Sequence, residues 1–161
     1  DFLLYCIRNS EHKANLYKKS KFKSKIIDFG RVYIEFYRKP SREALNKSKH
    51  FVEPLFIQSI EDYAEEIVSV GHQYGEGWLL TGEMIELIHG DAPNIVCIQP
   101  FGCLPNHITG KGVMKAVRER YEQANIIAID YDPGASEVNQ VNRIKLMMTS
   151  AKEALKEKKE A

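Results

Sequence analysis

The chain has 161 residues, of which 43% are hydrophobic and 28% charged, values typical of a globular protein that forms one domain with a sizeable core. No apolar run reaches the roughly 18 residues that a membrane span requires, and the first residues have the wrong length and charge order for a signal peptide. We therefore expect a cytoplasmic protein with no membrane partner, neither fibrous nor disordered. The chain begins with Asp1 followed directly by apolar residues, so we expect a fragment of a larger fold.

The formal net charge of +1 conceals a strong segregation of charge along the chain. Residues 1–50 carry 13 Lys or Arg against 5 Asp or Glu, residues 51–99 carry none against 9, and residues 100–161 carry 10 against 8. A basic segment can bind nucleic acid, but this one lacks Gly/Arg repeats and regularly interleaved aromatic residues. We expect no nucleic-acid partner and instead expect the basic and acidic segments to pack on each other.

Residues 1–69 are predicted to be helical, first basic and then acidic, and to pack on a sheet. A short apolar helix is followed by a basic connector over residues 16–25 and by an aromatic-rich helix over 25–39, which Pro40 kinks or ends. Apolar residues at spacings of three and four predict an amphipathic helix over 57–68 with an acidic outer face.

Residues 70–161 are predicted to form an α/β lobe that completes one compact domain with the helical segment. A short apolar run bounded by proline, such as residues 94–99, is typical of a strand buried on both faces. The pattern predicts helix, strand, helix, strand and helix over 78–88, 94–99, 112–121, 125–129 and from Ser136 onward.

Two strands joined by a crossover helix form a parallel βαβ unit, and such units lie in sheets with helices on both faces. The predicted fold class is therefore α/β and helix-rich, with a short parallel sheet built on a C-terminal βαβα unit.

Ligands of open parallel sheets collect at the carboxyl ends of the strands. The loops over residues 100–112 and 130–136 both follow predicted strands, so they are expected to lie at one edge of the sheet. Five side chains that can carry chemistry would then face one space: Cys103, His107, Lys111, Asp130 and Asp132.

Gly110, Lys111 and Gly112 suggest a phosphate site, because backbone N–H groups and a lysine at a helix N-terminus favour anions. The segment is not a Walker A loop, since seven residues rather than four separate Gly102 from Gly110 and no Ser or Thr follows Lys111. The alternative is that Thr109 caps the helix and the glycines ease a tight turn.

The cysteines of this stretch have different expected roles. Cys97 and Cys103 are six positions apart with His107 four further on, a spacing that matches no common zinc site. Cys97 is predicted to point into the core from its strand, whereas Cys103 lies past the strand end. Cys103 is then either a half-buried inert thiol, a nucleophile paired with His107, or a metal ligand.

Asp130 and Asp132 also allow two interpretations. They can be a strand end and a turn before a helix cap, or they can bind a metal, a hydroxyl group or a neighbouring chain.

Segments 75–87, 94–112 and 125–148 carry a resemblance to a known family, and residues 1–6 and 37–49 support it more loosely. The chain resembles the C-terminal part of the 2-hydroxyacyl-CoA dehydratase-like region in long acyl-CoA dehydratase activase-related proteins of anaerobic bacteria. These belong to the 2-hydroxyglutaryl-CoA dehydratase activator, or CoA-substrate-specific enzyme activase, family.

The resemblance implies that ATP-driven activator domains pass one low-potential electron to a [4Fe–4S] cluster, which reduces a 2-hydroxyacyl-CoA transiently to a ketyl radical that loses water. By motif, Cys103 corresponds to a cluster ligand, and Gln140 and Arg143 belong to the closing unit of the lobe. His107 and Lys111 would assist by hydrogen bonding or by holding a phosphate or thioester.

A cluster normally needs three or four thiolates, so it is expected in the full-length protein and not in this fragment alone. The implied partners are the rest of the longer chain, namely the ATPase activase domains and an N-terminal dehydratase-like lobe, with acyl-CoA and a second copy as further candidates. The alternative is a non-catalytic interaction module that docks the ATPase half or a second subunit.

Overall fold

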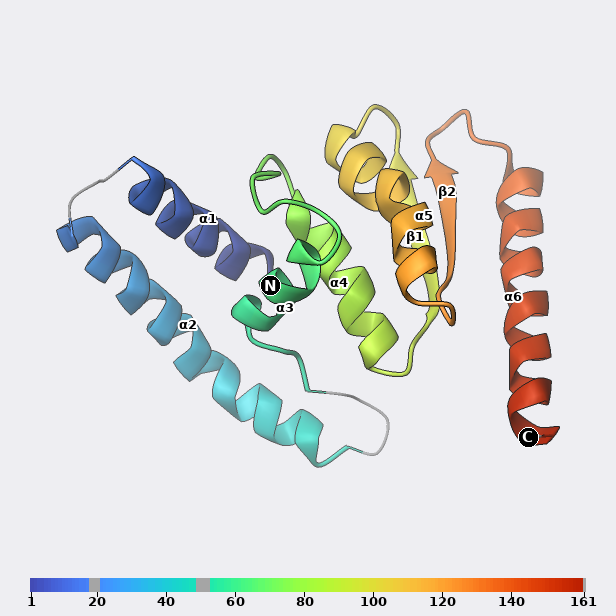
Figure 1. The fold of residues 1–161 in the computed structure, drawn as a ribbon, viewed down its shortest axis with the longest axis horizontal. Helices are drawn as coiled ribbons and strands as arrows, with labels where there is room; N and C mark the ends of the chain where they lie inside the picture. The colour runs from blue at the N-terminus through green and yellow to red at the C-terminus, as the bar shows by residue number, and fades with distance from the viewer. Residues whose placement is uncertain (18–20, 49–52, 161) are drawn as a thin grey trace. The chain divides into compact units, whose positions relative to one another are not determined.

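The protein is described by a computed structural model that covers residues 1–17, 21–48 and 53–160. The chain divides into two compact units, Asp1–Ile60 and Glu61–Ala161, whose elements are labelled in Figure 1. No helix within the described ranges is both long and apolar enough to cross a membrane. That the two units form one compact domain stays a prediction.

The first unit is helical, as the sequence predicts. Helices α1 (Phe2–Leu16) and α2 (Lys21–Asn46) lie side by side, and the unit ends in the first turn of α3 (Ile57–Glu65). Part of the connector predicted over residues 16–25 lies outside the described residues, and the described part already belongs to α1 and α2.

Pro40 does not end its helix, contrary to one of the two outcomes expected from the sequence. It lies inside α2, which continues to Asn46. A proline removes one N–H and so deprives the carbonyl of Phe36 of its helical partner. Both residues are exposed, so water can replace that bond. Arg42 further supports the later turns, with ion pairs of 3.2 Å to Glu35 and 2.5 Å to Glu53.

The second unit contains a βαβα arrangement. Its strands are β1 (Asn94–Pro100) and β2 (Asn125–Tyr131), which pair in parallel with Cys97 opposite Ala128 and Gln99 opposite Asp130. Its helices after the end of α3 are α4 (Trp78–His89), α5 (Met114–Arg120) and α6 (Glu137–Glu160). The predicted helix-rich α/β class with a short parallel sheet is therefore confirmed.

The core of this unit lies on one face of the sheet. Residues of α4, α5 and both strands, with Val113 just before α5 and Ala124 just before β2, form one buried cluster: Met84, Ile88, Ile95, Cys97, Val113, Met114, Val117, Ala124, Ile126 and Ala128. On the opposite face of β1, Val96 and Ile98 are 39% and 52% exposed. The prediction that β1 is buried on both faces is thus wrong, because α4 and α5 pack only on the side chains that alternate with these two.

Helix α6 runs beside β2 (Figure 1). Two of its side chains, Arg143 and Gln140, donate hydrogen bonds to backbone carbonyls of that strand. The Asn125 amide also donates a hydrogen bond of 3.0 Å to the carbonyl of Met147 in α6. Alternate carbonyls of β2 accept bonds from long side chains: Ile126 from Arg118, Ala128 from Arg143 at 2.7 Å and Asp130 from Gln140 at 2.9 Å. Alternate carbonyls point to the same side of a strand, so these groups occupy the edge of β2 that faces away from β1.

The helical segment after β1 begins earlier than predicted. A π-helical turn over Asn106–Gly110 and a 3₁₀ turn over Lys111–Val113 precede α5, so Thr109 is not an N-cap. Instead the Thr109 hydroxyl donates to the carbonyl of Pro105 at 2.9 Å, and its own carbonyl accepts a 2.7 Å bond from Thr81 in α4. This buried bond between two threonines fixes the turn against α4, a tertiary contact that no local pattern reveals.

Candidate functional site

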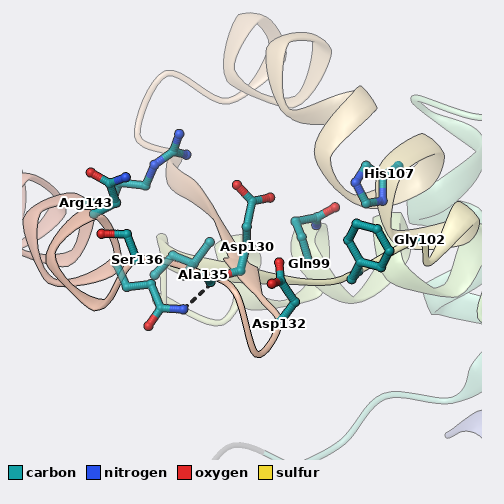
Figure 2. Close-up of a pocket in the computed structure, with 12 residues that line it drawn as sticks. Gln99, Gly102, His107, Asp130, Asp132, Ala135, Ser136 and Arg143 are labelled. Carbon is teal, nitrogen blue, oxygen red and sulfur yellow. Dashed lines mark hydrogen bonds between the residues drawn. The ribbon is translucent and has the colours of Figure 1, made fainter.

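A pocket of about 510 Å³ lies at the carboxyl ends of β1 and β2 (Figure 2). Its wall comes from the end of β1 with the turns that follow, from the end of β2 with its loop, and from the start of α6. The polar residues of this wall include Gln99, His107, Asp130, Asp132, Ser136 and Arg143. This is the place where ligands of open parallel sheets are expected.

Three of the residues selected from the sequence meet in this pocket. His107, Asp130 and Asp132 all line it, although they come from two different loops. Lys111 lies next to it, with its Nζ 3.9 Å from Oδ1 of Asp130. Both side chains of this pair are about half exposed, so solvent weakens their attraction.

Cys103 lies beside the pocket and is not part of its wall. The chain turns at Gly102, whose φ of 67° is easily adopted only by glycine, and the Cys103 N–H then donates to the carbonyl of Pro100 at 3.1 Å. The Cys103 thiol is half-buried, and its Sγ accepts a hydrogen bond of 3.1 Å from Nδ2 of Asn106.

His107 binds the backbone of Cys103 rather than its sulfur. Its ring Nδ1 lies 2.8 Å from the Cys103 carbonyl, and its backbone N–H donates to the same oxygen at 3.2 Å. A carbonyl only accepts, so Nδ1 carries the proton and Nε2 is left as the other ring nitrogen. The arrangement gives no hydrogen bond between the two side chains of a Cys–His nucleophile pair.

Cys97 is a core residue, as predicted. Its side chain belongs to the buried cluster, and burial raises the pKa of the thiol, which therefore stays protonated at neutral pH. Across residues 1–17, 21–48 and 53–160, no group of three or more His, Cys, Asp or Glu side chains is arranged to hold a metal ion.

Gly110 and Gly112 permit close packing. A Cβ on Gly110 would lie 3.0 Å from Sγ of Cys97, and one on Gly112 would lie 3.0 Å from the carbonyl oxygen of His107. The backbone N–H of Lys111 donates to the carbonyls of Asn106 and His107, so it is engaged within the chain. These contacts support the structural interpretation of the glycines more than the phosphate site.

Asp130 and Asp132 differ in their local roles. Oδ1 of Asp132 accepts a 2.7 Å bond from the Gly134 N–H, and its carbonyl accepts one of 3.0 Å from Ala135, so Asp132 builds the turn after β2. The Asp130 carboxylate has no such turn contact and points into the pocket, next to Gln99 in Figure 2.

Gln99 is the pocket residue that the sequence analysis missed. It is only 1% exposed, and its Nε2 donates to Sγ of Cys97 at 3.0 Å and to the Ile98 carbonyl at 3.5 Å. Its Oε1 is buried and has no hydrogen-bond partner among the described residues. The available signal was a polar residue at the third inward position of an otherwise apolar strand, after Ile95 and Cys97.

Comparisons of the chain with protein-family models, with curated proteins and with solved structures find no match. A functional proposal therefore rests on the geometry of these residues together with the resemblance of the sequence segments described above.

Proposed function

We propose that this chain is the C-terminal lobe of a cytoplasmic, dehydratase-like [4Fe–4S] protein that ATPase activator domains supply with electrons. The observation that supports this proposal is the position of Cys103. Its thiol is half-buried just past the end of β1, beside the pocket at the sheet edge, and accepts an N–H from Asn106. Cysteine binds metals through its sulfur, and this sulfur lies outside the buried core.

The residues of this chain do not make a complete cluster site by themselves. A cluster needs three or four thiolates, and Cys103 supplies one. The Cys97 sulfur belongs to the core and is bound by Gln99, while Cys6 belongs to α1 of the other unit. The remaining ligands would come from the rest of the longer chain, and no reaction step is derived through the cluster.

Within this proposal, the neighbours of Cys103 hold it in place. His107 makes two hydrogen bonds to its carbonyl, and Asn106 makes one to its sulfur. Asn106 and His107 are therefore positioning residues, and the loop around Cys103, outside the pocket wall, is the part of this lobe that would face an acyl-CoA.

The test compares Cys103→Ser with Cys97→Ser in the full-length protein purified without oxygen. We expect Cys103→Ser to lose most of the iron and the visible absorption of the cluster. Cys97→Ser serves as the matched control, because its hydroxyl can still accept the Gln99 N–H, and it should keep both signals. Full iron content in Cys103→Ser removes the ligand role.

A non-catalytic interaction module is the second candidate, since the structure leaves apolar side chains exposed. Val96 and Ile98 on β1, and Val141, Ile144 and Met148 on α6, are all at least 39% exposed. Large apolar surfaces often mark interfaces. The module would dock the ATPase half or a second copy, and it predicts that Cys103→Ser keeps its iron content while binding of that partner persists.

A further inference from the structure

Several hydrogen-bond acceptors line the pocket at the ends of β1 and β2. Asp130, Asp132 and Gln99 all line it. The Nδ1 proton of His107 is bound by the Cys103 carbonyl, which leaves Nε2 as the ring nitrogen that can contact a ligand. A complementary ligand therefore has to donate several hydrogen bonds.

The Gln99 oxygen is independent support for a ligand. A buried acceptor without a donor is costly, and most such groups in proteins are satisfied. The Gln99 nitrogen is bound on the core side by Cys97 and Ile98, which directs Oε1 away from them. Figure 2 shows the Gln99 side chain rising beside Asp130 toward His107, so the pocket is the space from which a donor can reach it.

The charges around the pocket favour a neutral ligand. Arg143 lines it with one guanidinium nitrogen held by the Ala128 carbonyl, and Lys111 lies against Asp130. These two cations offset the two carboxylates. A free anion would meet Asp130 and Asp132, and a free cation would meet Arg143, whereas neutral hydroxyl groups can donate to the carboxylates at no such cost.

The rim of the pocket adds a flat apolar surface. The Phe101 ring lines the pocket and is 86% exposed, so a ligand can reach it. Exposed aromatic rings of this kind stack on heterocyclic bases. An acidic residue at the end of the second strand of a βαβ unit is also well placed to accept bonds from ribose hydroxyls.

We propose that this pocket binds a nucleoside, with the vicinal 2′,3′-hydroxyls of the ribose donating to Asp130 and Gln99 and the base stacked on Phe101. The inference does not depend on the cluster. The ribose of coenzyme A carries a phosphate on its 3′-oxygen and lacks a free diol, so this ligand is distinct from the acyl-CoA considered above.

The experiment is calorimetric titration of the protein with adenosine, 2′-deoxyadenosine, ribose and coenzyme A. We expect adenosine to bind, and 2′-deoxyadenosine and coenzyme A to bind at least about tenfold more weakly, the cost of one hydrogen bond to a charged group. Ribose should bind more weakly than adenosine. Equal affinity for ribose and adenosine would overturn the nucleoside assignment in favour of a free sugar.

Variants locate the site. Asp130→Asn should weaken adenosine binding at least about tenfold. Asp62→Asn, an exposed carboxylate on α3 outside the pocket, should leave it unchanged. Gln99→Leu removes the acceptor from a buried position, so the folding of this variant is first checked by thermal unfolding. If Gln99→Leu does not fold, the binding measurement on Asp130→Asn alone tests the proposal. Absence of adenosine binding, or equal binding by Asp130→Asn, overturns the proposal.

Discussion

Gly110, in the turn that precedes α5, lies close to the side chain of Cys97 on β1. The glycine has no side chain, which lets the turn approach the buried sulfur and the amide of Gln99, a residue that lines the pocket. The identity of residue 110 therefore affects the packing of the core and the shape of the candidate site together.

Gly110→Ala tests this contact. The new Cβ would lie 3.0 Å from Sγ of Cys97, so we expect the free energy of unfolding to fall by about 1–3 kcal/mol, as in other overpacked cores. Chemical denaturation measures this change. In the double variant Cys97→Ala/Gly110→Ala the sulfur is absent, so the added methyl should cost less than in the wild-type background. An equal cost in both backgrounds would show that the sulfur is not the obstacle.

The candidate site was partly predictable at the scale of residues. Asp130, Asp132 and His107 could be brought together because parallel strands place their carboxyl ends at one edge of a sheet. The role of Gln99 could not be predicted, since whether an amide oxygen finds a donor depends on neighbours from several elements. The same holds for His107, whose ring nitrogen binds a carbonyl four residues away in a π-helical turn.

The end of α3 and the end of α5 are joined by a small polar cluster. Oε2 of Glu66, just after α3, lies 2.5 Å from Nε of Arg120 and accepts a 2.7 Å bond from the Tyr121 hydroxyl. His89 at the end of α4 stacks on Tyr63 with ring centroids 4.7 Å apart. Three helices of the second unit thus meet through side chains at their C-terminal ends.

This cluster predicts a pH dependence of stability. The hydrogen bond from Tyr121 and the bond and charge of Arg120 hold the pKa of Glu66 below its ordinary value of 4.5. The stabilisation is therefore present above pH 4.5 and is lost as the pH falls through the lower folded-state pKa. Because the pair is partly exposed, we expect at most about 1 kcal/mol.

Glu66→Gln should lower the melting temperature at pH 7. The melting temperatures of the variant and the wild type should become equal as the pH approaches 3. Thermal unfolding followed by circular dichroism over this range measures both curves. Asp62→Asn, on α3 itself, is the control and should not change the shape of the profile. A constant difference between Glu66→Gln and the wild type at every pH would contradict the assignment.

The order and type of the elements in the second unit followed from hydrophobic periodicity and from the crossover rule, since these depend on local sequence. The features that differed from the sequence-based predictions, a helix start and the burial of a strand, depend on tertiary contacts. Thr109 begins no helix because Thr81 binds its carbonyl, and β1 is covered on one face because α4 and α5 pack on the same side. A strand with apolar residues on both faces, as at Ile95 to Ile98, does not reveal which face is covered.

At the scale of the molecule, the uneven covering of the sheet has a consequence for association. Val96 and Ile98 belong to the exposed face of β1, and Val141, Ile144 and Met148 are exposed on α6. Hydrophobic side chains left in water in such numbers drive association. We therefore expect the 18.5 kDa chain to self-associate in solution when no other part of a longer protein covers these residues.

Ile98→Lys tests this expectation. A charge on the exposed face of β1 should shift the chain toward the monomer in sedimentation or light-scattering measurements over a concentration series. Leu87→Lys, at an exposed position of α4, introduces the same charge on another element and should leave the association unchanged. A monomeric wild-type chain, or an Ile98→Lys variant that associates as the wild type does, contradicts the prediction.

The side chains bound to β2 decide in which direction the sheet can grow. Arg118, Arg143 and Gln140 already donate to the carbonyls that a further strand would need on that side. An additional strand, whether from a longer chain or from a misfolded neighbour, can therefore pair only with β1. The outer edge of β2 is thus blocked, which hinders edge-to-edge aggregation on that side. In any larger sheet, further strands would be added on the side of β1.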